Sequence, residues 1–546
     1  MKVIKYFFLT AIVCMASLVS CQDAPEELTQ LDFDRIFTPS GLSVLPLQTT
    51  ALVSWNLTQG ASEYLVQVSR DSLEFTTDLK EYTTEDLFLN LTELIGSTQY
   101  SVRVMAISPE ERPADSRWNR LAFKTQDEQL LHSIPASAIK SRQVTITWVP
   151  DPNVNRLVLT PAGGSGQSIL LDEADIEAAG KTITGLTPGT GYTIGIYFDQ
   201  TRRGRQTFTT KWVPDCNDPN VLCLGIGDNL RDAIGDPYNA GKLIFLPEGY
   251  TYTWGGGQQV AGGFTIYGDP DGDRPVITLS AGAPFVLNGL TSGNDVIRFE
   301  NVELVSTHAS GYLINQGTDA TANACHIKSL TFENCRLADF GRSIIRTQAP
   351  NEKFDIIRIN NCLIENCSKE SGQNYAIIQS TVAFEAFPNI EITNTTVNHS
   401  YASFLSLAGG SLQPSGKNIL IENVTFYKTV GSNSATPDNR YLIDGGNNGP
   451  LNITIKNCIL GSVRGVGNER GFRMKVDGRM TAEDNYATTD WTTVADGEAT
   501  PPILNIPTKA YNGSATTLFV DPANGDFRIK DASFAGKATA GDPRWR

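Results

Sequence analysis

Basic side chains and one carboxylate stand at similar places in the C-terminal half of the chain, where short apolar segments alternate with polar residues. Arg346, Asp444, Arg473 and Lys475 each lie at the end of such a segment. Guanidinium and ammonium groups bind carboxylates, and a base held beside a bound carboxylate could remove a neighbouring proton. These residue types therefore indicate either binding of an acidic ligand or proton abstraction from it.

The residues belong to a series of polar side chains that recur once in each sequence repeat. The series is Asn315, Arg346, Gln379, Ser406, Asp444 and Lys475. Hydrogen-bonding groups at a regular spacing would form a linear shelf that suits an extended sugar chain. Five bases, Arg464, Arg470, Arg473, Lys475 and Arg479, stand against only Glu469 and Asp477, so the shelf ends in a positive patch. The alternative interpretation is that these seven charged residues are ordinary scattered surface charges without a ligand.

Two aromatic residues in polar loops could add stacking surfaces for sugar rings. Trp254 precedes three glycines, and Tyr375 follows Gly-Gln-Asn. Loop aromatics can also close the end of a domain, which is the competing interpretation. The predicted glycan-binding set is Trp254, Asn315, Arg346, Tyr375, Gln379, Asp444 and Lys475.

The element that must position these residues is a strand pattern that occurs six times. Each copy has apolar residues two and four places before an Asn and another three places after it; the Asn residues are Asn301, Asn334, Asn361, Asn394, Asn423 and Asn457. Repeats of 27 to 34 residues without a helical segment require consecutive parallel strands, which predicts a parallel β-helix. We expect the Asn side chains to stack as a structural ladder, not to catalyse.

Two shorter modules precede the repeats, over residues 36–126 and 127–211. Both show short alternating strands with a Trp early and a Tyr late: Trp55 and Tyr100 are 45 residues apart, and Trp148 and Tyr192 are 44 residues apart. A large aromatic in an early strand and a Tyr at a late corner are typical of a β-sandwich. Both Trp side chains are predicted to be core residues.

These motifs resemble known families. The Trp and the Leu-x-x-x-Thr-x-Tyr segment are similar to fibronectin type III domains. Residues 212–546, with a capping helix predicted at 228–235, resemble right-handed parallel β-helices of the pectate-lyase kind. The last segment, 526–545, is similar to a terminal cap segment of uncharacterised Bacteroides-type surface lipoproteins encoded with glycan-import systems. The resemblance implies an all-β chain and a theme of glycan use.

The resemblance does not extend to the catalytic motif of pectate lyases. Those enzymes carry Arg-x-Pro-x-x-Arg and acidic Ca²⁺ ligands, whereas this chain has Arg342-Ser-Ile-Ile-Arg346 without the Pro. An enzyme is therefore not the favoured interpretation, and no cofactor or metal is expected. If the chain were a polysaccharide lyase or hydrolase, Arg346, Asp444, Arg473 and Lys475 would be its first catalytic candidates and Ca²⁺ its cofactor.

The N-terminus predicts export. Lys2 and Lys5 precede an apolar stretch that ends in Leu-Val-Ser-Cys21, which indicates a signal peptide over 1–20 and lipidation of Cys21. Residues 21–35 form an acidic tether. It resembles the surface-export signal of Bacteroides-type lipoproteins, so we expect a lipid-anchored protein of the outer membrane, at the cell surface.

Cysteine usage fits an exported chain. Cys216 and Cys223 flank a short loop and could form a disulfide. Cys335 and Cys362 follow ladder Asn residues, and we expect them to be buried thiols in preference to a second disulfide. Four His in the whole chain and no Cys-x-x-Cys pair argue against zinc.

The expected function is capture of an acidic, pectin-like polysaccharide at the cell surface within a glycan-utilisation system. The net charge of −15 and the lack of an extended basic run argue against nucleic acid. Two alternatives remain: a polysaccharide lyase or hydrolase, and a structural or docking partner of an outer-membrane glycan importer.

Overall fold

The structure is a computed structural model that describes residues 34–546, apart from 369–374, 382–385, 401–402, 408–416, 431–439, 448–449, 465–469 and 476. Cys21, the signal peptide and most of the tether lie outside the described residues. The chain divides into two compact units, Met1–Leu186 with Thr190–Thr210, and Thr187–Gly189 with Lys211–Arg546. In the described part of the chain, no helix is long and apolar enough to cross a membrane.

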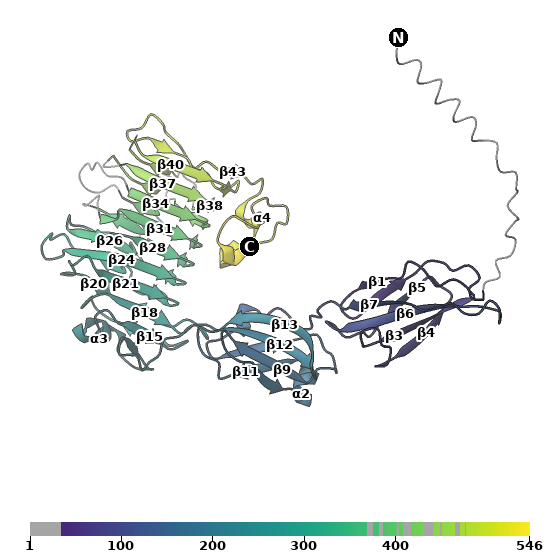
Figure 1. The fold of residues 1–546 in the computed structure, drawn as a ribbon. Coiled ribbons are helices and arrows are strands. Elements are labelled where there is room, and N and C mark those ends of the chain that lie inside the picture. Colours follow the sequence, from purple (N-terminus) through teal and green to yellow (C-terminus); the bar gives the residue numbers. More distant parts are fainter. Residues whose placement is uncertain are drawn as a thin grey trace, which may run out of the picture. The chain divides into compact units, whose positions relative to one another are not determined.

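The first module is an antiparallel β-sandwich (Figure 1). One sheet holds β1 (Ser43–Pro46), β2 (Ala51–Ser54) and β5 (Phe88–Leu91), and the other holds β3 (Glu63–Ser69), β4 (Lys80–Thr84), β6 (Gln99–Ile107) and β7 (Asn119–Lys124). Trp55 is buried between them, and the Tyr100 hydroxyl accepts a hydrogen bond from the Ile95 backbone N–H at 3.0 Å. Both aromatic residues have the roles that their spacing predicted.

The second module repeats this architecture. Its four-stranded sheet holds β9 (Arg156–Pro161), β10 (Gln167–Leu170), β12 (Gly191–Phe198) and β13 (Thr201–Thr209), and β8 (Gln143–Thr147) pairs with β11 (Gly180–Thr184). A short helix, α2 (Glu173–Ala178), precedes β11. Trp148 and Tyr192 are buried in the core.

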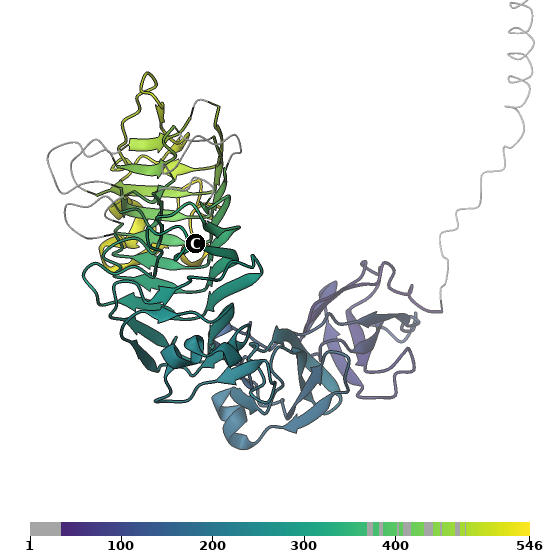
Figure 2. The same cartoon turned by 90° about the vertical axis from the view of Figure 1, so that its left-hand side faces the viewer.

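The C-terminal unit is a parallel β-helix, here called the solenoid, whose coils stack along one axis (Figures 1 and 2). Its first sheet contains β14 (Val221–Cys223), β15 (Leu243–Leu246), β18 (Phe264–Gly268), β21 (Asp295–Glu300), β24 (Cys325–Glu333), β27 (Glu352–Phe354), β28 (Ile357–Asn360), β31 (Asn389–Thr393), β34 (Lys417–Glu422), β37 (Leu451–Lys456) and β40 (Arg479–Glu483).

The second sheet contains β16 (Thr251–Trp254), β19 (Val276–Leu279), β22 (Glu303–Ser306), β25 (Arg336–Ala338), β29 (Leu363–Glu365), β32 (Thr396–Asn398), β35 (Thr425–Thr429), β38 (Ile459–Val463), β41 (Tyr486–Ala487) and β43 (Lys509–Ala510). The third contains β17 (Gln258–Gln259), β20 (Phe285–Val286), β23 (Ile314–Asn315), β26 (Ile345–Thr347), β30 (Ile378–Ser380), β33 (Leu405–Ser406), β36 (Tyr441–Asp444), β39 (Arg470–Arg473) and β42 (Ile503–Leu504). Of the strands just given for these three sheets, β42 alone pairs antiparallel among the described residues. The predicted fold class is confirmed.

The predicted Asn ladder forms the turn between the first and second sheets. All six Asn residues have a positive φ, between 49° and 56°, a left-handed conformation that Asn tolerates better than most residues. Asn334 donates to the Asn301 side chain at 2.8 Å, Asn361 donates to Asn334 at 3.2 Å, and Asn423 donates to Asn394 at 3.0 Å. The side chains therefore link one coil to the next.

A helix covers one end of the solenoid, as the sequence predicted. Helix α3 (Leu230–Gly235) is capped by the Asn229 side chain, which accepts hydrogen bonds from the N–H groups of Arg231 and Asp232. Its residues Leu230 and Ile234 pack into the apolar interior of the solenoid.

The terminal segment, with α4 (Ala515–Leu518), β44 (Phe519–Asp521) and β45 (Asp526–Ile529), lies along the flank of the coils (Figures 1 and 2). It shares a small apolar core with Tyr427, Ile459 and Tyr486 of the second sheet. Thr396 Oγ1 donates to Asp542 at 2.8 Å and accepts from Trp545 Nε1 at 2.8 Å. The segment therefore fastens several coils together from the side.

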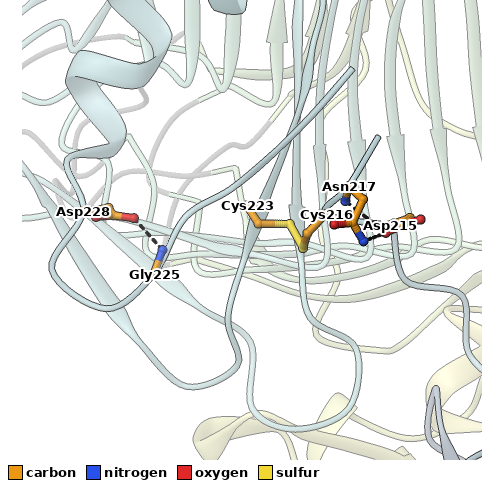
Figure 3. Close-up of a disulfide and its surroundings, with 6 residues drawn as sticks. All are labelled: Asp215, Cys216, Asn217, Cys223, Gly225 and Asp228. Carbon is orange, nitrogen blue, oxygen red and sulfur yellow. Dashed lines mark hydrogen bonds between the residues drawn. A yellow bond between two sulfur atoms is a disulfide. The ribbon is translucent and has the colours of Figure 1, made fainter. Parts of the chain in front are cut away.

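The predicted Cys216–Cys223 disulfide is present beside the first coil (Figure 3). Asn217 donates to the Asp215 carboxylate next to it, and Asp228 accepts from the Gly225 N–H at 2.6 Å. The cysteines at 325, 335, 362, 367 and 458 are buried thiols outside any disulfide. The thiol interpretation of Cys335 and Cys362 is therefore confirmed.

Candidate functional site

The polar series of the sequence repeats forms a continuous column along the third sheet. Register pairs place Asn315 beside Arg346, then Gln379, Ser406, Asp444 and Arg473 in successive coils. We call these six residues the shelf; all but Asp444 are partly exposed. Successive strands of a sheet are about 4.8 Å apart, so the shelf is a regular row of polar groups.

The last member of the shelf differs from the prediction, which had Lys475 in this place. Asp444 pairs with Arg473, because Phe472 points into the core and Arg473 points outward. Lys475 lies beyond the end of β39, where its Nζ is 3.4 Å from the Asp477 carboxylate. The predicted basic patch is therefore partly neutralised, since Lys475 lies near Asp477 and Arg473 pairs with Asp444 of the preceding coil.

Two tyrosines and two arginines gather at the N-terminal part of the shelf. Tyr312, Asn315, Arg342, Arg346 and Tyr375 form what we call the Tyr312 station. The Tyr312 and Tyr375 rings meet edge to face, with centroids 5.7 Å apart. The Arg342 and Arg346 guanidinium carbons lie 4.9 Å and 5.3 Å from the Tyr375 ring centroid. Cation–π contacts thus hold both guanidinium groups at one place on the sheet.

The buried phenol of Tyr312 is the centre of this station. Its hydroxyl accepts hydrogen bonds from Arg342 at 3.3 Å and from Arg346 at 3.2 Å. Burial, together with a hydrogen bond to Tyr375, raises the pKa of Tyr312. The phenol is therefore protonated at neutral pH and suits binding better than proton abstraction.

A similar group lies further along the same sheet. Tyr441, Asp444 and Arg473 form what we call the Tyr441 station. The Arg473 guanidinium carbon is 4.6 Å from the Tyr441 ring centroid. Arg473 also binds the Asp444 carboxylate with two nitrogens, at 2.7 Å and 2.6 Å. The Asp444 hydrogen bond and charge raise the pKa of Arg473 against the effect of burial, which lowers it.

Two amide side chains of the shelf, those of Asn315 and Gln379, are held by neighbouring side chains. The Asn315 Oδ1 accepts from Gln348 Nε2 at 3.1 Å, and the Gln379 Oε1 accepts from the Ser343 hydroxyl at 3.2 Å. These contacts fix the amides in place, so the row is ordered before any ligand arrives.

Trp254 does not contribute to the shelf. Its side chain is 1% exposed, its Nε1 donates to the Gly256 carbonyl at 3.1 Å, and its ring packs on Phe285 with centroids 4.4 Å apart. Trp254 ends a strand whose alternate residues point inward, which places the indole in the core. The prediction of a sugar-stacking surface at Trp254 is therefore corrected. Tyr375, in contrast, is partly exposed.

The outer face of the first sheet is polar too, but its groups satisfy one another. Arg298 pairs with Glu300 at 2.8 Å, Arg358 with Glu391 at 2.8 Å, and Lys456 with Glu422 at 3.2 Å. Across the part of the chain that the structure describes, no group of three or more His, Cys, Asp or Glu side chains could hold a metal ion. The third sheet is the better candidate for a ligand.

Four of the six shelf residues were predicted as glycan-binding residues and lie at their predicted places in the row. They are Asn315, Arg346, Gln379 and Asp444. The sequence prediction missed Tyr312, Tyr441 and the part that Arg342 plays. The signal for the two tyrosines was present, because Tyr312 and Asn315 enclose Leu-Ile, and Tyr441 and Asp444 enclose the same pair.

Comparisons with known proteins describe the two ends of the chain. Residues 419–545 match the family described as "Domain of unknown function (DUF5123)". No curated protein matches. Among solved structures, a two-domain fibronectin type III segment of chicken tenascin is 18% identical, with 32% of this chain and 98% of that chain covered and a TM-score of 0.23.

Two further solved structures are β-sandwiches of single-domain size. The FN5 domain of Drosophila Lar is 22% identical, covers 17% of this chain and 97% of its own, and has a TM-score of 0.15. A computationally redesigned β-sandwich is 24% identical, and the match covers 16% of this chain and 94% of that chain. Its TM-score is also 0.15. The matched family spans the last coils of the solenoid together with the terminal segment, and its description names no activity.

Proposed function

We propose that the third sheet of the solenoid binds an extended acidic polysaccharide along the shelf. The observation that carries this proposal is the register-matched row from Asn315 to Arg473, which includes a guanidinium, that of Arg346, with no ion-pair partner among the described residues. A chain of sugars can follow such a row because both repeat at short, regular intervals. Ordered polar groups also bind at a lower entropic cost than mobile ones.

The experiment uses the chain from residue 22 onward and compares polygalacturonate with neutral polysaccharides in affinity gels, with and without Ca²⁺. Retardation by polygalacturonate is the expected result. Release of unsaturated uronates, seen as ultraviolet absorbance, would instead make the chain a lyase. No retardation by any acidic polysaccharide would refute the proposal.

The proposal includes a position at the cell surface, where a lipid on Cys21 holds the chain on the outer membrane beside glycan-import proteins. The motivating observation is the sequence Leu-Val-Ser-Cys21 after an apolar stretch. Metabolic labelling with a radioactive fatty acid should mark the unmodified protein and not the Cys21→Ser variant. Equal labelling of both, or protection of the protein from protease added to intact cells, would contradict this position.

A further inference from the structure

The two stations share a Tyr-Leu-Ile triplet, the residue that follows it and an arginine in the next coil; the Tyr312 station has Arg342 and Tyr375 in addition. Each begins with Tyr-Leu-Ile, Tyr312 to Ile314 in one and Tyr441 to Ile443 in the other. Each has an arginine in the next coil, in register with the residue that follows the triplet. That residue is Asp444 in the Tyr441 station and Asn315 in the Tyr312 station. The shared Tyr–Arg arrangement therefore occurs twice in the chain, once with a carboxylate, Asp444, and once with an amide, Asn315.

In the Tyr441 station the carboxylate completes the arrangement. Asp444 is 9% exposed, and both of its oxygens accept hydrogen bonds from Arg473. Such a two-point contact matches the planar fork of a guanidinium to the plane of a carboxylate. The Tyr441 ring lies against the same guanidinium.

In the Tyr312 station this carboxylate is missing. Asn315 supplies an amide in its place, and that amide is already held by Gln348. The Arg346 Nε is buried and has no hydrogen-bond partner. A buried guanidinium nitrogen without a hydrogen-bond partner is costly, and no carboxylate pairs with Arg346 among the described residues, so the station suits an anion.

One carboxylic acid lies close to Arg346, but it does not replace the missing group. Glu352 is fully buried inside the solenoid, and its Oε2 accepts hydrogen bonds from the backbone N–H groups of Gln348 and Ala349. No ion pair joins it to Arg346 within the described residues. Arg346 is partly exposed, so a ligand can reach it, and its guanidinium carbon lies 5.3 Å from the Tyr375 ring centroid.

We infer that the Tyr312 station binds the carboxylate of a uronic acid unit in the place that Asp444 occupies beside Arg473, with Arg346 as its principal partner. This inference rests on the proposed function, since the uronate is a unit of the polysaccharide on the shelf. The carboxylate lies on Arg346, and the sugar ring lies towards Tyr375. The Tyr441 station, whose arginine already has a carboxylate, does not bind a second one.

The decisive variant is Asn315→Asp, which supplies the missing carboxylate from within the chain. It should weaken binding of polygalacturonate about tenfold or more, because the internal group competes for Arg346. It should also raise the unfolding temperature without ligand, because the Arg346 guanidinium gains a charged partner. Arg346→Gln should weaken binding by a similar factor. Arg358→Gln, on the first sheet, is the matched control and should bind as the unmodified chain does.

Titration calorimetry of the chain from residue 22 onward, with polygalacturonate, its methyl ester and dextran sulfate as probes, separates the outcomes. Binding of polygalacturonate and not of its ester supports the inference. Equal binding of the ester, or of dextran sulfate, overturns the assignment to a carboxylate. If the unmodified chain binds but Asn315→Asp and Arg346→Gln bind equally well, the inference fails and the proposed function stands. If the unmodified chain binds nothing acidic, the proposed function fails.

Discussion

Glu352 is a carboxylic acid whose side chain lies wholly inside the solenoid. Its Oε1 has no hydrogen-bond partner, and its register neighbour in the preceding coil is the buried Cys325. Burial raises the pKa of Glu352 from 4.5 to about 7, although backbone hydrogen bonds and the charge of Arg346 lower it. Because the folded-state pKa is the higher one, the stability that this group contributes is present below about pH 4.5 and is lost as the pH rises through about 7.

Glu352→Gln should therefore stabilise the chain at pH 8 and not at pH 5. The amide cannot ionise, so it avoids the cost of a buried charge, which is roughly 1–3 kcal/mol at pH 8. Urea unfolding of the chain from residue 22 onward at several pH values measures the difference. The exposed Glu498→Gln is the control, and a Glu352→Gln effect that is the same at both pH values would contradict the account.

The sequence predicted which positions of the shelf are polar. It did not predict which residue of the last coil, Arg473 or Lys475, pairs with Asp444. Phe472 and Met474 are both buried, and a shift of two residues leaves the same face of a strand outward. Alternation alone therefore fits Arg473 and Lys475 equally well. Trp254 was misjudged for a related reason, since the glycines after it indicate a loop although the Trp itself ends a strand.

Among the elements, the Asn ladder combines an unusual backbone conformation with side-chain bonds. Asn334 has a φ of 51°, donates to Asn301, and accepts from Asn361 and from Arg274 at 2.6 Å. Asn334→Ala should lower the free energy of unfolding of the solenoid by about 2–4 kcal/mol, because the variant loses the side-chain hydrogen bonds of Asn334 and places an alanine in a strained left-handed conformation.

The companion variant Asn334→Gly separates the two effects. Glycine adopts a positive φ without strain, so the Asn334→Gly variant should lose only the free energy that the side-chain hydrogen bonds contribute. Its free energy of unfolding should be about 1 kcal/mol higher than that of Asn334→Ala. Urea unfolding followed by circular dichroism gives both values. An alanine variant as stable as the glycine variant would show that the backbone conformation at this turn costs nothing.

The buried carboxylate of Asp542 is one of the groups that attach the terminal segment to the coils. The Asp542 side chain accepts from the Thr396 hydroxyl and from the Arg544 N–H. Asp542→Ala should leave these groups unpaired and cost about 1–3 kcal/mol. Hydrogen exchange should speed up in the terminal segment and not in the sandwiches. Asp526→Ala, at an exposed pair with Arg528, is the control; equal exchange in both variants would refute the role of Asp542.

Elements were the most predictable part of the molecule. Six repeats with one apolar face leave little choice but stacked parallel strands, and the Trp and Tyr pairs indicated both sandwiches. The position of the terminal segment was not predictable in this way. Its contacts join residues far apart in the sequence, such as Thr396 with Trp545, and no periodicity marks such a pair.

Among the residues that the structure describes, one disulfide coexists with five buried thiols. Burial raises the pKa of Cys325 and Cys458 to about 12, and thiolates are the reactive form. Iodoacetamide should therefore label none of the five in the folded chain from residue 22 onward. It should label five in denaturant, and seven after reduction, as mass spectrometry would show. Rapid labelling without denaturant would mean that the coils open readily.

The same buried thiols make unfolding hazardous in an oxidising environment. Once the coils open, the buried thiols become accessible and can attack the Cys216–Cys223 bond and exchange partners. A chain that has mispaired cannot rebuild the interior, so heating without a reductant becomes a one-way process. In such an environment the working lifetime of this protein is then governed by how rarely its coils open, which is a rate and not an equilibrium constant.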